Sequence, residues 1–142
     1  MRRLLLALAI ACAAASGATA ASMPAVSAHS SRFGRILFDG RGFVLYAFTK
    51  DRLRHSACSG ACAVRWPPFV VKAKPVALSG VPARLLGTTR RGDGRLQVTY
   101  AGRPLYYYVG DRSPRQILCQ DVSEFGGLWL VVSPTGKPVR SS

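Results

Sequence analysis

Short apolar and aromatic runs, separated by glycine, proline and charged residues, extend along most of the chain. None of them keeps the 3.6-residue apolar period of an amphipathic helix, so long helices are not expected, and one helical turn is predicted within 56–64. Asp39 and Gly40 separate two runs and favour a β-hairpin, because this pair suits the positive φ angles of a type I′ turn. The predicted strands cover 36–38, 43–48, 69–71, 85–89, 96–100, 105–109 and 128–132.

One aromatic pattern occurs twice, with a period of 60 residues. Both copies read G-x-x-L-Y-x-[FY]-x-x-D, and a tryptophan follows each copy. Such a period indicates a duplicated structural unit. Each half alone would bury too little apolar surface, so the two halves are expected to share one core. The motif residues are Tyr46, Phe48 and Asp51 with Trp66 in the first copy, and Tyr106, Tyr108 and Asp111 with Trp129 in the second.

Many short strands with glycine and proline turns predict an all-β fold. We expect a single small antiparallel sandwich or barrel-like domain, built from two pseudo-symmetric repeats that an approximate internal two-fold relates. The two motif segments should occupy equivalent strands, with Trp66 and Trp129 buried beside them.

The aromatic residues of each motif stand two positions apart and therefore project from one face of a strand. We expect them to form a shared aromatic core, the alternative being a platform on which a ligand stacks. Asp51 and Asp111 fall where these strands should end. An aspartate there commonly fixes a turn by accepting backbone N–H groups, and acid–base chemistry or metal binding is the alternative.

The N-terminus has the features of a secretory signal. Arg2 and Arg3 precede an apolar run over 4–15, and a small-x-small site ends at Ala20. The run is too short to span a membrane, so we expect cleavage after Ala20 and no transmembrane span in the mature chain. The alternative is lipid attachment at Cys12.

These signals predict an exported protein, periplasmic or extracellular, which would be membrane-attached if Cys12 were lipidated. The expected organisation is a signal peptide over 1–20, a flexible linker over 21–31, the two-repeat β domain over 32–138 and a disordered tail over 139–142.

The chain is strongly basic, with 20 lysine and arginine residues against 6 acidic ones. Such an excess normally suggests a polyanionic partner. Export argues against nucleic acid. The basic residues are scattered along the domain, which fits a solubilising surface or, more sharply, attraction to anionic lipid headgroups or cell-wall polymers.

Cys58 and Cys62 form a C-x3-C pair, for which an oxidising compartment favours a disulfide. His55 lies just before the pair, so His55, Cys58 and Cys62 are an alternative copper or zinc site, or a thiol-redox pair. Pairing of Cys119 with one of the two is a further alternative; otherwise Cys119 is a free thiol.

Motifs for catalysis are scarce in this sequence. His55 is the single histidine of the expected domain, and no nucleophile elbow, zinc-protease helix or phosphate-binding glycine loop occurs. We therefore expect a non-catalytic binding or structural module without a cofactor.

The combination of motifs resembles that of bacterial secreted-repeat proteins, a family of putative lipoproteins with a Y-x-[FWY]-x-x-D motif. The resemblance rests on the two tyrosine motifs, on Cys58–Cys62 followed by Trp66-Pro67-Pro68, and on Gly126-Gly127-Leu128-Trp129. It covers residues from about Phe38 to Pro134. It implies an exported, envelope-associated protein of two repeats, and it implies no activity.

Overall fold

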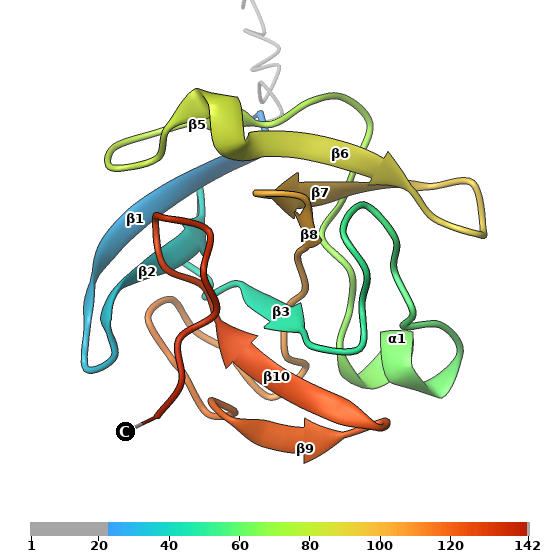
Figure 1. Cartoon of the computed structure of the whole chain (residues 1–142). Helices are drawn as coiled ribbons and strands as arrows, with labels where there is room; N and C mark the ends of the chain where they lie inside the picture. The colour runs from blue at the N-terminus through green and yellow to red at the C-terminus, as the bar shows by residue number, and fades with distance from the viewer. Residues whose placement is uncertain (1–22, 142) are drawn as a thin grey trace, which may run out of the picture.

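The computed structural model describes residues 23–141 (Figure 1). The predicted signal peptide, the cleavage after Ala20 and the lipidation of Cys12 therefore lie outside the described residues. Within 23–141, no helix is long and apolar enough to cross a membrane.

Strands dominate the structure, and the predicted all-β fold is confirmed. The elements in chain order are β1 (Ala25–Ser31), β2 (Gly34–Asp39), β3 (Tyr46–Phe48), α1 (Ala61–Arg65), β4 (Val70–Val71), β5 (Val76–Ala77), the 3-10 turn η1 (Ala83–Leu85), β6 (Leu86–Arg90), β7 (Leu96–Tyr100), β8 (Arg103–Pro104), β9 (Val122–Glu124) and β10 (Gly127–Val131). Within 23–141 the one α-helix, α1, begins inside the predicted helical turn over 56–64 and ends one residue beyond it.

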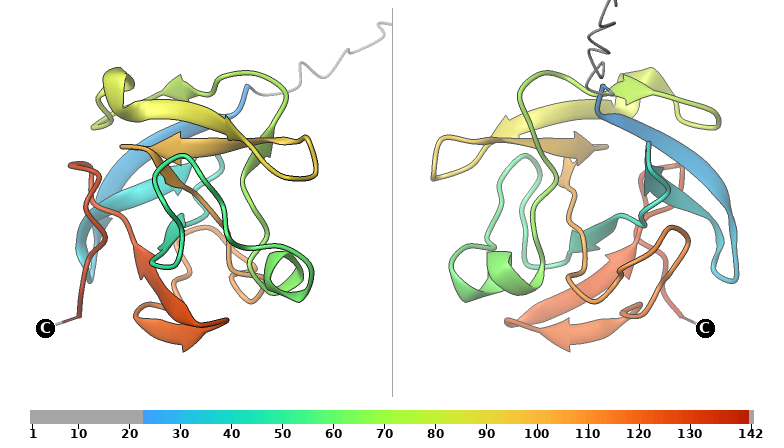
Figure 2. Two further views of the ribbon diagram at one scale, coloured as in Figure 1. Left: turned by 45° about the vertical axis from the view of Figure 1, so that its right-hand side comes forward. Right: turned by 180° about the vertical axis from the view of Figure 1, so that it is seen from behind.

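The strands form three small sheets with the orders β2-β1-β5, β3-β10-β9 and β4-β7-β6, and β8 adds to β7 (Figures 1 and 2). All pairings between these strands are antiparallel except that of β1 with β5. Two sheets combine the halves of the chain, because β3 pairs with β10 and β4 pairs with β7. The two repeats therefore share their sheets as well as their core.

The predicted flexible linker over 21–31 is wrong from Ala25 onward. Residues 25–31 are strand β1, which pairs with β2 from Val26↔Asp39 to Ser31↔Gly34. Val26 and Ala28 are buried in the core. The small residues of this strand carry little hydrophobic signal, yet they fit where a sheet is covered closely on both faces.

Three smaller expectations also need correction. The turn after β2 has its positive φ at Gly42 and not at Asp39–Gly40, and the Asp39 carboxylate accepts the N–H groups of Arg41 and Phe43. Only Arg103–Pro104 of the second motif region pairs as a strand, and within 105–109 only Tyr106 forms isolated bridges. The predicted disordered tail is anchored, because Val139 N–H donates to the Val131 carbonyl at 2.8 Å.

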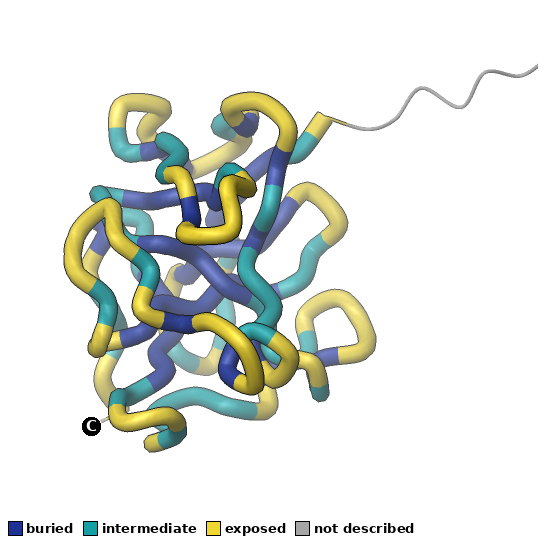
Figure 3. The backbone as a smooth tube through the Cα atoms, turned by 90° about the vertical axis from the view of Figure 1, so that its right-hand side faces the viewer, coloured by how far each residue is buried: buried dark blue, intermediate teal, exposed yellow. Residues whose placement is uncertain are grey.

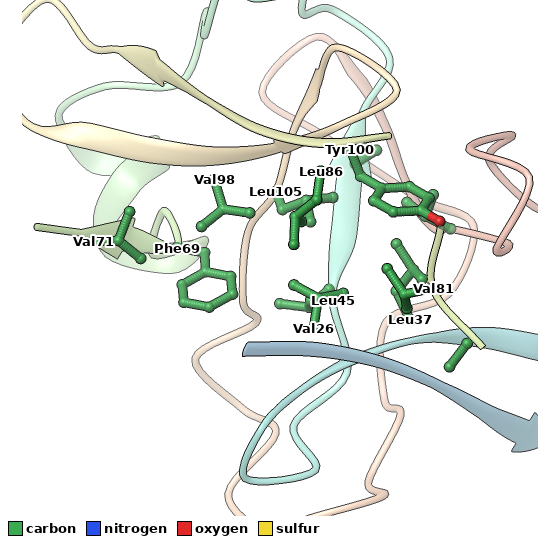
Figure 4. Packing of buried hydrophobic residues seen from close by; sticks show 13 residues of the cluster. Val26, Leu37, Leu45, Phe69, Val71, Val81, Leu86, Val98, Tyr100 and Leu105 are labelled. Atoms are coloured by element: carbon green, nitrogen blue, oxygen red, sulfur yellow. The ribbon is translucent and has the colours of Figure 1, made fainter. Parts of the chain in front are cut away.

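The buried residues form two clusters, and buried backbone runs through the centre of the domain (Figure 3). The first is mainly aliphatic and lies between β1, β2, β4, β6 and β7; Figure 4 shows Val26, Leu45, Val98 and Leu105 pointing toward one another within it. The second is mainly aromatic and contains both tryptophans. This aromatic cluster lies where the two repeats meet.

Candidate functional site

The two motif tyrosines lie opposite each other at the junction of the repeats. Tyr46 N–H donates to the Tyr106 carbonyl and Tyr106 N–H donates to the Tyr46 carbonyl, both at 2.9 Å. This reciprocal pair is antiparallel, as an internal two-fold requires. The structure thus brings the motif segments together.

The tyrosine of each repeat bonds to the aspartate of the other repeat. The Tyr46 hydroxyl donates to Asp111 Oδ2 at 2.7 Å, and the Tyr106 hydroxyl donates to Asp51 Oδ2 at 2.7 Å. Four motif residues thus cross-link the two halves of the domain through side-chain hydrogen bonds.

The other carboxylate oxygen of each aspartate fixes a loop. Asp51 Oδ1 accepts the Ala57 N–H at 2.6 Å, and Asp111 Oδ1 accepts the Leu118 N–H at 3.0 Å. Both aspartates therefore have the turn-fixing geometry favoured by the sequence. These contacts leave little of either carboxylate for acid–base chemistry or for a metal.

Burial governs the protonation of these groups. It raises the pKa of Asp51 to about 6, although the bonds from Ala57 and Tyr106 act in the opposite direction. Burial likewise raises the pKa of Asp111. It also raises the pKa values of Tyr46 and Tyr106 well above the ordinary tyrosine value. Both hydroxyls consequently keep their protons and act as hydrogen-bond donors.

The two tryptophans stack at the same junction and are fully buried, as predicted. Their ring centroids lie 4.1 Å apart with planes 3° from parallel. Each contacts one motif tyrosine edge-on, Trp66 with Tyr46 at 5.2 Å and Trp129 with Tyr106 at 5.1 Å. The aromatic residues at this junction are packed against one another as core, and the alternative of an open stacking platform does not fit their burial.

A buried arginine extends the network of the first repeat and was not anticipated from the sequence. Arg91 Nη1 donates to Ser56 Oγ at 2.9 Å and to Gln97 Oε1 at 2.7 Å, and its Nη2 donates to the Cys58 carbonyl at 2.6 Å. Ser56 Oγ lies 2.7 Å from the Tyr106 hydroxyl. Arg91 precedes a Gly-Asp-Gly turn, where an arginine is ordinarily exposed, so no local signal marked it.

The predicted disulfide Cys58–Cys62 is confirmed, and Cys119 is free and half-buried. In the bridged form neither sulfur is a thiolate, so the alternative metal site of His55, Cys58 and Cys62 lacks two ligands. Among residues 23–141, no three His, Cys, Asp or Glu side chains are grouped to hold a metal ion.

All six acidic residues serve as hydrogen-bond acceptors within the fold. Four of the basic residues in the described range form ion pairs with them: Arg41 with Asp39, Arg65 with Glu124, and Arg91 and Arg95 with Asp93. The remaining lysines and arginines make no ion pair within 23–141. Asp39 accepts an N–H of Arg41, Asp51 that of Ala57, Asp93 that of Arg95, Asp111 that of Leu118, Asp121 that of Ser141, and Glu124 the indole N–H of Trp66.

The surface of the described part of the chain is hollowed in places. A groove of about 1060 Å³ runs along β4 and is lined mainly by apolar residues, including Phe69, Val71 and Leu78. A smaller hollow of about 410 Å³ lies beside the β1–β2 turn and is lined by two arginines, Arg32 and Arg115. Neither hollow is lined by Tyr46, Asp111, Tyr106 or Asp51. The groove is lined by Asp39 and Tyr107, whose side chains are hydrogen-bonded to each other at 3.0 Å.

Comparison with known proteins shows two matches to one family model, whose description is a secreted repeat of unknown function. The matched residues are 28–70 and 87–133, one match for each repeat. No curated protein matches the chain, and no solved structure matches it. The first match begins within β1, in the segment that the sequence had suggested was a linker.

Proposed function

Because the chain belongs to the family of secreted repeats of unknown function, we propose that it is a non-catalytic envelope module whose basic surface binds an anionic cell-wall polymer. The family supports export. The proposed binding rests on the distribution of charge in the protein. It specifies the partner only by its chemical class, an anionic polymer.

One observation carries this proposal: every acidic residue accepts a hydrogen bond within the fold, while within 23–141 all but four of the basic residues form no ion pair. Basic residues outnumber acidic ones by 20 to 6 in the chain, and each acidic residue is already a hydrogen-bond acceptor. Apart from the four ion pairs, the acidic side chains of the protein do not neutralise its basic side chains. A polyanion would therefore be attracted to these remaining positive charges.

The arrangement of the cations favours a flexible polymer over a flat bilayer. Exposed cations occur on strand β2 at Arg35, between β4 and β5 at Lys72 and Lys74, and at the end of β6 at Arg90. These segments lie on different sides of the domain (Figure 2). A flat membrane contacts one side at a time, whereas a polymer chain can follow several.

The tyrosine–aspartate junction supports a structural role for the motif. Its hydroxyls and carboxylates are satisfied by one another and by loop N–H groups, and its rings are buried. The motif therefore builds the scaffold that presents the basic loops, and binding belongs to the surface.

A salt series tests the proposal. Binding of the exported protein to poly(glycerol phosphate) should weaken steeply between about 0.01 M and about 0.15 M salt, because the Debye length falls from about 30 Å to about 8 Å. The same salt series is measured with vesicles of phosphatidylglycerol and phosphatidylcholine, so that binding to lipid can be compared with binding to the polymer. Binding that does not respond to salt, or no binding to the polymer, would contradict the proposal, and tighter binding to the vesicles would make lipid the partner.

A further inference from the structure

The smaller hollow lies between two segments that are far apart in the sequence. Ser30 and Ser31 at the end of β1, Arg32 in the following turn and Phe38 of β2 form one side. Arg115 and Ile117, in the loop before β9, form the other side. The hollow has a volume of about 410 Å³, which is within the range of small-ligand sites.

Each arginine reaches across the hollow to the opposite backbone. Arg32 Nη2 donates to the Ile117 carbonyl at 2.7 Å, and Arg115 Nη1 donates to the Ser30 carbonyl at 3.5 Å. Aromatic rings support both guanidinium groups, with Arg115 lying 5.0 Å from the centroid of Phe38 and Arg32 lying 4.8 Å from that of Phe33. The two cations are thus held in place before any ligand arrives, which lowers the entropy lost on binding.

Most of the donor capacity at the hollow is unused. A guanidinium group has five N–H donors, and within 23–141 each of these arginines spends one of them on the protein. The exposed Ser30 hydroxyl makes no side-chain hydrogen bond within the same range. The hollow therefore offers a set of convergent donors.

No negative charge neutralises these cations. None of the lining residues is acidic, and neither Arg32 nor Arg115 forms an ion pair within the described chain. The acidic residue closest in sequence to Arg115 is Asp111, whose carboxylate is turned toward Tyr46 and the Leu118 N–H. The site is thus a fixed pair of positive charges without a counter-ion from the protein.

We propose that this hollow binds a phosphate-type oxyanion, with Arg32 and Arg115 each donating to it. A phosphate group presents oxygens in several directions, so two guanidinium groups from opposite sides can bind it together, whereas a carboxylate presents one edge. This assignment rests on the proposed function, since a phosphate ester of the anionic polymer is its natural ligand. A lipid headgroup carries the same chemistry.

The two arginines also tie the loop to the hairpin, and a test must separate this role from binding. The site variant R32Q/R115Q removes both cations, and R32K/R115K keeps the charge but loses the planar fork. The matched control is R84Q/R140Q. It makes the same change in net charge at exposed residues whose side chains form no hydrogen bond or ion pair within 23–141.

The primary measurement is titration of the exported protein with inorganic phosphate, followed by NMR at the amides of the hollow and at the arginine Nε–H groups. We expect saturable shifts at Ser30, Arg32 and Arg115 in the wild type and the control. Phosphate affinity should fall at least about tenfold in R32Q/R115Q, as the loss of charge-assisted hydrogen bonds requires. R32K/R115K, whose unfolding transition is measured in parallel, should also bind more weakly while remaining folded.

A second arm uses poly(glycerol phosphate) and phosphatidylglycerol vesicles with the same three variants. If R32Q/R115Q loses more polymer binding than R84Q/R140Q does, the polymer is the source of the phosphate. If R32Q/R115Q loses more vesicle binding than R84Q/R140Q does, lipid is the source. If the site and control variants bind phosphate equally, the hollow is not the site and the assignment is overturned, while salt-dependent polymer binding would still stand. If the wild type binds phosphate at the hollow but no polymer, the proposed function fails and the assignment holds.

Discussion

Individual side chains explain why the motif contains both a tyrosine and an aspartate. The motif tyrosine of each repeat donates its hydroxyl hydrogen bond to the motif aspartate of the other repeat and not to the aspartate of its own repeat. A single copy of the motif would leave one group of each kind unsatisfied in a buried place, which is unfavourable. The motif is therefore complete only as a pair.

The first residue-scale prediction concerns this exchange. Tyr46→Phe should lower the free energy of unfolding by about 1–3 kcal/mol, because Asp111 loses a buried donor. Urea unfolding measures the change. Tyr108→Phe is the control, since Phe48 already occupies the equivalent position of the first repeat; its effect should stay within about 0.5 kcal/mol. Equal effects of the two substitutions would show that the exchange contributes little.

The second prediction concerns pH. The pKa of Asp51 is about 6 in the folded protein, against about 3.9 in an unfolded chain. The folded state therefore binds the proton more tightly, and the contribution of Asp51 to the free energy of unfolding is largest below about pH 4 and is lost as pH rises to about 6. The total change is at most about 3 kcal/mol.

Urea unfolding of the wild type and of Asp51→Asn across this pH range gives the test. The unfolding free energy of the wild type minus that of Asp51→Asn should fall as the pH rises from about 4 to about 6 and then stay constant. A wild-type value that rises relative to the variant over this range would show that the carboxylate form is the one stabilised by Ala57 and Tyr106.

At the scale of elements, β1 is the strand whose importance was hidden. It is the central strand of its sheet, with β2 on one side and β5 on the other. Removing residues up to Met23 should leave stability unchanged, because Met23 precedes the strand and is exposed. Removing residues up to Ser31 should prevent folding, because the core loses Val26 and Ala28 and the sheet loses its centre. Amide dispersion by NMR distinguishes the two results; a folded protein without 25–31 would contradict the prediction.

The strands that sequence patterns predicted are those with large β-branched or aromatic side chains. Leu96–Tyr100 is a strand at the predicted residues, and β10 begins and ends one residue earlier than expected. The segment after Pro104 was overestimated, because Tyr106 forms isolated bridges to Tyr46 of β3 and to Pro68, before β4, and these bridges do not form a ladder. Local patterns cannot reveal such a crossing.

The candidate sites were predictable to different degrees. The duplication indicated that both motifs meet in one core, and their burial follows from strand spacing. Which tyrosine bonds which aspartate depends on how the two repeats pack against each other, which no local pattern specifies. The pairing of Arg32 with Arg115 was beyond sequence reasoning for the same reason, since their hydrogen bonds join segments 85 residues apart.

At the scale of the whole molecule, two incomplete halves form one domain. Strands of both halves pair in two sheets, and the described disulfide lies within the first half. Cutting the exposed segment between Ala73 and Lys74 should leave an assembled protein, because no strand contains the cut. After separation in urea, neither fragment should fold alone, and mixing the two should restore the native NMR spectrum.

Size-exclusion chromatography of the cut protein supplies the control for this experiment, since a non-covalent pair elutes with the intact chain. A fragment that unfolds cooperatively on its own would contradict a shared core.

The stacked indoles of Trp66 and Trp129 have an optical consequence. At a centroid separation of 4.1 Å with nearly parallel planes, two identical chromophores share their electronic excitation and do not absorb independently. Such exciton coupling splits an absorption band into two circular-dichroism bands of opposite sign. Because one indole belongs to each repeat, this couplet exists only while the two repeats are joined, whatever secondary structure each retains. The protein thus carries an intrinsic, label-free reporter of its own assembly.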